Sequence, residues 1–145
     1  MMLGTNDAKY GNWGHLSAEF PIDYQAMIAS FKNLTSKPKI WLMVPPPLYQ
    51  DNRYGMNQTV INTLFPGHGP AGVRTLAAAA NLPAPIDLFT LFQGHCPVKG
   101  GTPGNPANRT DVPCDWIAGG GKDACHPNNV GYGQIAATVK AAIWG

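Results

Sequence analysis

Hydrophobic and polar residues follow one another along this chain in a pattern that predicts strands alternating with helices. The opening residues, Met-Met-Leu, have the character of the end of a buried strand. A loop rich in Gly, Asn and Trp is expected at residues 9–15. A helix should follow, because apolar residues behind Pro21 recur three and four positions apart: Tyr24, Met27, Ile28 and Phe31.

Two further apolar runs predict strands. Residues 40–44, Ile-Trp-Leu-Met-Val, lie between a polar turn and three prolines, which is typical of a parallel strand buried on both faces. Residues 86–92 predict another strand. Between these runs, a helical stretch interrupted by Pro and Gly is expected from residue 56 to residue 81.

The last third of the chain is predicted to be mostly loop from residue 94 to residue 121, followed by a C-terminal helix. Five apolar residues at helical spacing predict the core face of that helix: Tyr132, Ile135, Ala136, Val139 and Ile143. The order of strand end, helix, strand, helix, strand, loop and helix indicates an α/β fold with parallel strand pairing.

Composition fits a single folded domain over residues 1–145. Hydrophobic residues make up 44% of the chain and charged residues only 12%, which argues against disorder. The formal net charge of +2 and the scattered basic residues argue against a nucleic-acid partner. Because no apolar run approaches the roughly 20 residues of a membrane span, no membrane partner is expected either.

Cysteines and glycosylation sequons favour a secreted or extracytoplasmic location. Asn-X-Ser/Thr sequons begin at Asn33, Asn57 and Asn108, and three cysteines lie in the loop-rich last third. Buried, reduced cysteines in a cytosolic protein remain the alternative. The cysteine spacing matches no zinc pattern, so neither a metal nor an organic cofactor is implied.

A disulfide is expected if the protein is secreted. We expect it to join Cys114 and Cys125, because ten residues of Gly-rich chain separate them and can bend freely. Cys96 would then be single.

Two short motifs near opposite ends carry candidate chemistry. Gly4-Thr5-Asn6-Asp7 follows the apolar start, and Asp123-Ala124-Cys125-His126-Pro127-Asn128 precedes the last helix. In a parallel α/β sheet, ligands collect at the carboxyl ends of the strands, so Asn6 and His126 should reach one crevice, within about 10 Å of each other. The alternatives are a turn-capping Asn6 and a surface His126 beside a capping Asp123.

Together these motifs resemble two active-site blocks of the SGNH (GDSL-type) ester hydrolases. Supporting similarities are Ala-Lys and Asn-Trp shortly after the first block, and the strand followed by prolines at residues 41–47. The resemblance implies a three-layer α/β/α sandwich with a parallel sheet, of the flavodoxin-like type. It also implies that Asn6 donates to the oxyanion, that His126 is the general base and that Asp123 orients it.

The resemblance further places four residues at the substrate: Gly4, Thr5, Asp7 and Trp13. The family's Gly-Asp-Ser nucleophile block and its oxyanion glycine block are absent from this chain. We therefore expect one partial domain, incomplete at its N-terminal end, whose catalytic serine belongs to a missing N-terminal segment. Ser17 and Cys125 are the alternative nucleophiles.

The function predicted from these features is carboxylic ester hydrolysis of a small-molecule or glycan ester, of which carbohydrate O-deacetylation is one form. The alternative is a catalytically inactive relic or fragment of that fold that binds carbohydrate or protein.

Overall fold

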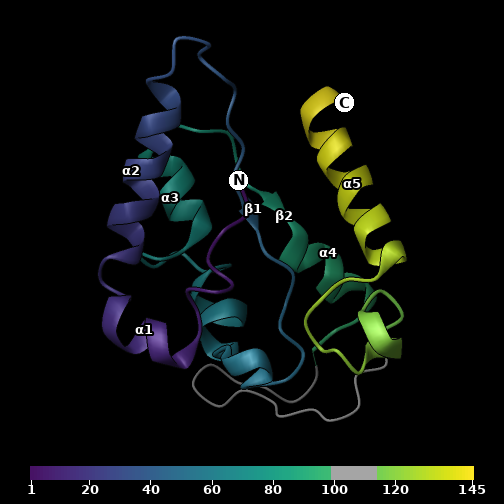
Figure 1. Ribbon diagram of the computed structural model, residues 1–145. Helices are drawn as coiled ribbons and strands as arrows, with labels where there is room; N and C mark the ends of the chain where they lie inside the picture. The colour runs from purple at the N-terminus through teal and green to yellow at the C-terminus, as the bar shows by residue number, and fades with distance from the viewer. Residues whose placement is uncertain (99–113) are drawn as a thin grey trace.

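The computed structural model describes residues 1–98 and 114–145 as a helix-rich α/β arrangement (Figure 1). In the view of Figure 1, α2 and α3 lie on one side of the short strands and α5 on the other. The elements, in chain order, are α1 (Tyr10–Leu16), α2 (Phe20–Lys32), β1 (Met43–Val44), the 3-10 turn η1 (Arg53–Gly55), the π-helical turn η2 (Val60–Leu64), α3 (Val73–Ala79), β2 (Ile86–Asp87), α4 (Leu88–His95), the 3-10 turn η3 (Ala118–Gly121) and α5 (Asn129–Trp144).

The strands pair in parallel, as the sequence predicts. β1 lies beside β2, with Met43 opposite Ile86. On its other side, the amino group of Met1 donates to the carbonyl of Trp41 at 2.5 Å, and the Met1 carbonyl accepts from the N–H of Met43 at 2.8 Å. These two bonds follow the slanted pattern of a parallel ladder, so the first residues of the chain extend the pairing beyond β1.

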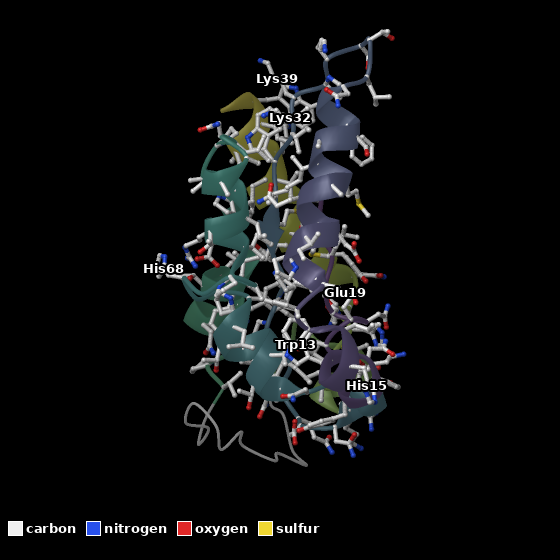
Figure 2. The ribbon with its side chains drawn as sticks, turned by 90° about the vertical axis from the view of Figure 1, so that its left-hand side faces the viewer. Trp13, His15, Glu19, Lys32, Lys39 and His68 are labelled. Atoms are coloured by element: carbon white, nitrogen blue, oxygen red, sulfur yellow. A yellow bond between two sulfur atoms is a disulfide. The ribbon has the colours of Figure 1, made fainter. Side chains whose placement is uncertain are left out.

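Two segments form helix where the sequence predicted otherwise. The expected loop at residues 9–15 is mostly α1, which turns Trp13 inward. His15, in the same helix, projects from one edge of the molecule, and His68 projects from the opposite edge (Figure 2). The expected strand over residues 86–92 ends at Asp87. There, the Asp87 carboxylate accepts from the N–H and the hydroxyl of Thr90 at 3.0 and 2.6 Å, which caps the start of α4.

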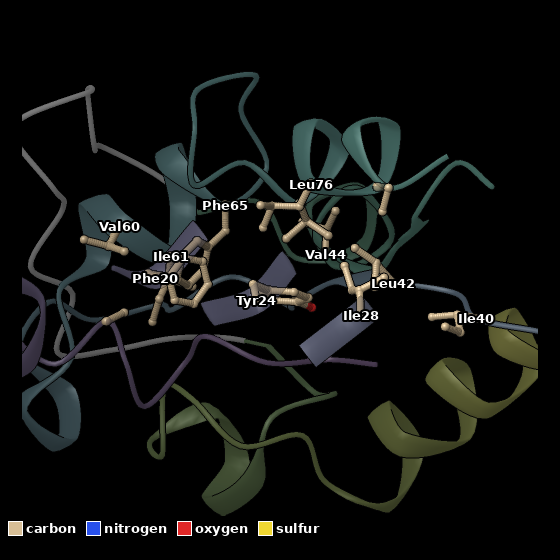
Figure 3. Packing of buried hydrophobic residues seen from close by; sticks show 14 of the residues in the cluster. Phe20, Tyr24, Ile28, Ile40, Leu42, Val44, Val60, Ile61, Phe65 and Leu76 are labelled. Carbon is tan, nitrogen blue, oxygen red and sulfur yellow. The ribbon is translucent and has the colours of Figure 1, made fainter. Parts of the chain in front are cut away.

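The main core lies between α2, α3 and the strands (Figure 3). Its aromatic centre is formed by Trp13, Phe20 and Phe65, whose ring centroids are 5.2–5.6 Å apart. Tyr24 and Ile28 of α2 face the strands, as the helical spacing predicted. Met27 and Phe31 are 44% and 40% exposed, so the buried stripe of α2 is narrower than predicted.

Helix α5 forms where it was predicted, but its apolar side is largely uncovered by the described residues. Gly131 is its one buried residue, and Tyr132 is 53% exposed. Ile135 packs against a second cluster of buried residues: Tyr49, Phe92, Cys114, Ile117 and Ala124. Val139 and Ile143, further along the predicted face, are half-buried, so that face is covered only in part.

The expected disulfide between Cys114 and Cys125 is wrong. Cys96 bonds Cys114, with their Cα atoms 5.4 Å apart, and Cys125 is a free thiol. The physical reason is the direction in which each side chain packs. Cys114 and Cys96 belong to the second cluster beside α4, whereas Cys125 packs against the main core. Closeness in the sequence did not decide the pairing.

None of the helices within residues 1–98 and 114–145 combines the length and the apolar character that a bilayer crossing requires.

Candidate active site

The Asp123–His126 pair is built by one tight turn. Ala124 adopts the left-handed conformation, with φ of 63°, and the chain folds back over the Asp123 side chain. Oδ1 of Asp123 accepts from the N–H of Cys125 at 3.1 Å and from the N–H of His126 at 2.6 Å. The same oxygen lies 2.9 Å from Nδ1 of His126. A carboxylate at Nδ1 leaves Nε2 as the nitrogen that can accept a proton.

Residues far away in the sequence anchor this turn. The carbonyl of Ala124 accepts from the N–H of Tyr49 at 2.9 Å. Nε of Arg53 donates to the Asp123 carbonyl at 2.8 Å, and the Tyr54 hydroxyl donates to Asp123 Oδ2, also at 2.8 Å. Sequence reasoning missed Arg53 and Tyr54, because no motif links η1 to the last third of the chain.

These contacts keep Asp123 ionised. Partial burial alone would raise the pKa of the Asp123 carboxyl. The His126 backbone N–H, the Tyr54 hydroxyl and the His126 ring together outweigh burial and hold that pKa below its ordinary value. Asp123 is therefore a carboxylate at neutral pH, which is the form that can orient an imidazole.

Asn6 lies in a turn directly after the first residues. The N–H of Ala8 donates to the Gly4 carbonyl at 2.8 Å, and the side chain of Asn12 donates to the Asn6 carbonyl at 3.1 Å. Within the described residues, no hydrogen bond engages the Asn6 side-chain amide. The turn-capping alternative for this side chain is thus without a supporting contact, and its amide can donate to a ligand.

Asn6 and His126 share one cavity of about 250 Å³. Its wall is mainly apolar and comes from the first residues of the chain, the proline segment after β1, η1 and the start of α5. Side chains that line it beside Asn6 and His126 include Met2, Thr5, Pro46, Leu48, Tyr54, Met56, Ile61, Cys125, Tyr132 and Ile135. The two motifs from opposite ends of the sequence therefore meet at one hollow.

The four residues expected at the substrate are divided between different places. Thr5 lines the cavity with Asn6. Gly4 is buried with φ of +111°, and a Cβ on it would lie 2.8 Å from the ring of Phe65, so its place in the fold depends on having no side chain. Asp7 and Trp13 line a separate hollow beside α2.

None of the three serines of the chain is among the residues that line the cavity. Ser30 donates to the Ala26 carbonyl within α2 at 2.9 Å, and Ser36 is exposed after that helix. Ser17 directly follows α1. The geometry thus gives the Ser17 alternative no support.

The thiol of Cys125 is poorly suited to nucleophilic attack. Burial, with the Asp123 carboxylate adding to it, raises the pKa of Cys125 to about 11. Donor atoms of Asp123, Cys125 and His126 lie within 4.8 Å of one another, as metal ligands could. The carboxylate and the ring already bond each other, and the thiol is protonated at neutral pH. The same spacing occurs at His95, Cys96 and Asp115, where Cys96 is committed to the disulfide.

Comparisons of the chain with protein-family models, with curated proteins and with solved structures found no match. The function is therefore argued from the geometry of this cavity and from the two motifs.

Proposed function

We propose that this chain is the part of an SGNH-type carboxylic ester hydrolase that carries the base and one oxyanion donor. The observation that carries the proposal is the cavity shared by Asn6 and the hydrogen-bonded Asp123–His126 pair. The GTND and DxxHPN motifs support it, because their order and context resemble the family's blocks.

In this mechanism, His126 Nε2 removes the proton from a serine hydroxyl as the serine attacks the ester carbonyl. Asp123 holds the imidazole tautomer and stabilises the imidazolium that forms. The Asn6 amide donates to the oxygen that becomes negative in the tetrahedral intermediate. His126 then returns the proton to the departing alcohol, and water releases the acyl group by the same steps in reverse order.

The serine and a second oxyanion donor come, in this proposal, from a segment outside the 145 residues. The positions of the three serines, away from the cavity, support this source. Met1 directs its backbone groups to β1, so those of Met2 face the opposite side, where no described residue pairs with them. A further strand added there would extend the parallel sheet towards the three-layer α/β/α sandwich of the family.

The substrate class that fits best is an ester of a short acyl group with a small alcohol or a glycan. Apolar side chains at the cavity wall suit the acyl group, and carbohydrate O-deacetylation is the reaction we favour. The Cys96–Cys114 disulfide and the sequons support a secreted or extracytoplasmic location.

The test is complementation. Alone, the chain should hydrolyse p-nitrophenyl acetate at little above the uncatalysed rate, because the nucleophile is absent. A matching N-terminal segment with Gly-Asp-Ser, fused or added in trans, should restore hydrolysis. In the restored enzyme, Asn6→Ala should lower kcat by about 10²–10³-fold, as loss of an oxyanion donor does.

A histidine pair provides the matched control for the base. His126→Ala should abolish the restored activity, whereas His68→Ala should leave it unchanged, because His68 is exposed at the edge of the molecule (Figure 2). Brisk hydrolysis by the isolated chain that Ser17→Ala removes would make Ser17 the nucleophile instead. Failure of every Gly-Asp-Ser segment to restore activity would favour the inactive binding relic.

A further inference from the structure

We propose that Tyr54 is a positioning residue for the Asp123–His126 pair, holding the carboxylate through its hydroxyl and the imidazole through its ring. The effect on catalysis rests on the proposed function, whereas the positioning itself does not. Neither motif at the ends of the chain contains this residue, and 69 positions separate it from Asp123.

The hydrogen bonds of Asp123 show what Tyr54 adds. Oδ1 has three hydrogen-bond partners within the turn itself: the N–H groups of Cys125 and His126, and Nδ1 of the His126 ring. Tyr54 supplies the hydrogen bond to the other oxygen, Oδ2, at 2.8 Å. With both oxygens bound from different directions, the carboxyl group cannot rotate about its Cβ–Cγ bond without losing a bond.

The ring of Tyr54 also contacts the second member of the pair. Its centroid lies 5.1 Å from that of the His126 ring, with the planes inclined by 59°. Tyr54 lines the cavity together with His126. The imidazole is thus held by Asp123 at Nδ1 and by an aromatic neighbour beside the ring.

Arg53 fixes the segment that presents Tyr54. Its Nε donates to the Asp123 carbonyl, and its Cζ lies 4.8 Å from the centroid of the Tyr54 ring. Two consecutive residues of η1 therefore hold the backbone and the side chain of Asp123 at once. The Arg53 contact therefore holds the backbone of Tyr54 in place beside Asp123, so that the Tyr54 hydroxyl can donate its hydrogen bond to Oδ2.

The backbone of Tyr54 is strained in a way that its contacts with Asp123 explain. Its φ of 53° lies in the left-handed region, as does that of Asn52 at 59°. Bulky side chains rarely adopt this conformation, and it persists where surrounding contacts hold it. From this backbone, the Tyr54 hydroxyl reaches Asp123 Oδ2 and the Tyr54 ring lies beside that of His126.

The decisive measurement needs no catalytic activity. In the isotope-labelled chain as it stands, the carboxyl ¹³C shift of Asp123 is followed against pH, and the ring ¹⁵N shifts of His126 report its tautomer. Tyr54→Phe keeps the ring and removes the donor. The Asp123 titration should move to higher pH, because the ionised carboxylate loses a hydrogen bond that favours it. Without the bond to Oδ2 the carboxyl group can rotate away from the ring, so the share of the Nδ1–H tautomer of His126 should fall.

Apart from Tyr54 itself, the charged and titratable groups around Asp123 are His126, Cys125 and Arg53. These three are the same in both proteins, so the Tyr54 hydroxyl is the variable. Tyr10→Phe is the matched control, since the exposed Tyr10 hydroxyl donates to Asp51 at 2.9 and 3.0 Å and Tyr10 does not line the cavity. This substitution should leave the Asp123 and His126 signals unchanged.

Tyr54→Leu separates the ring from the hydroxyl. It should shift the Asp123 titration as Tyr54→Phe does. It should also broaden the distribution of His126 ring orientations, which is measured as smaller residual dipolar couplings and a lower order parameter of the ring. The complemented enzyme should lose about tenfold in kcat with Tyr54→Phe at unchanged KM, the lower end for a hydrogen bond to a charged group.

Superimposable Asp123 titrations and His126 tautomers in Tyr54→Phe and the unsubstituted chain would overturn the proposal. Failure of complementation would remove the esterase reading but leave the shifts in Asp123 and His126 as a positive result. The two proposals therefore fail separately.

Discussion

Asp123 accepts hydrogen bonds from two backbone N–H groups, from a tyrosine hydroxyl and from the His126 ring. Three of these partners belong to its own turn, so most of the geometry of the pair is local. The fourth, Tyr54, comes from a distant segment and fixes the second oxygen. Local and long-range contacts thus divide the two oxygens of one carboxylate between them.

Cys125 provides a test of the environment beside this pair. Because its pKa is raised to about 11 from an ordinary 9.0, the thiolate fraction at neutral pH is about a hundredfold below that of an unperturbed cysteine. Iodoacetamide at pH 8 should therefore alkylate Cys125 of the native chain about a hundredfold more slowly, or slower still, than it alkylates Cys125 of the denatured chain. The rate should rise about tenfold per pH unit up to pH 10.

Mass spectrometry after timed quenching gives the rate and the modified residue. The same chain in denaturant, with the disulfide intact, is the control and should react rapidly at Cys125. Fast alkylation of the native chain at pH 7 would contradict the buried, protonated thiol and would revive Cys125 as a nucleophile.

At the scale of elements, helix starts decided where the fold departs from simple hydrophobic patterns. Residues 88–92 are apolar enough for a strand, but Asp87 caps a helix through Thr90. Arg74 of α3 forms an ion pair with the same carboxylate and fixes it from the other side. The start of α4 therefore depends on one acidic side chain between two elements.

The start of α5 depends on a close approach that two glycines can test. A Cβ on Gly131 would lie 2.4 Å from the Trp116 carbonyl and 3.0 Å from Pro127, so Gly131→Ala should push the helix away from this segment. We expect a loss of about 1–3 kcal/mol in the free energy of unfolding, as for other overpacked sites. Urea denaturation followed by circular dichroism measures it.

Gly133, in the same helix, is the matched control. A Cβ there meets no atom within 4 Å, so Gly133→Ala should raise the free energy of unfolding by about 0.5–1 kcal/mol through helix propensity alone. Equal effects of the two substitutions would mean that α5 does not pack against Trp116 as described.

At the scale of the whole molecule, the buried hydrophobic residues form two clusters of unequal size. The main cluster joins α2, α3 and the strands, whereas α5 contributes only Gly131 as a fully buried residue. Native-state hydrogen exchange should therefore show the slowest amides in α2, α3 and residues 41–44. Amides in the last turns of α5 should exchange at least about tenfold faster.

A complementing segment should change this distribution. If it covers the open side of α5, exchange in the last turns of that helix should slow, while the amides of α2 should change little. Equal protection of α5 and α2 in the chain alone would show that α5 is already covered.

The sequence by itself determined the features that depend on local periodicity or on a few neighbouring residues. Spacing of three and four residues located α2 and α5, and the apolar runs located the two paired strands. The closeness of Asp123 and His126 was predictable because three residues of chain suffice to fold the carboxylate onto the ring. A crevice shared by Asn6 and His126 was also predicted from the α/β order, with Asn6 after the first apolar residues and His126 in the loop before the last helix, and both residues line one cavity.

Only the tertiary structure decided the partners of residues that lie far apart in the sequence. Cys114 pairs with Cys96 and not with the nearer Cys125, because side-chain direction within separate clusters selects the partner. The contact between Tyr54 and Asp123 is likewise a contact between distant segments. The partial cover of the apolar face of α5 also depends on which other elements pack beside it. Such contacts follow from the packing of all elements together, and a local pattern contains no information about which distant surface will meet it.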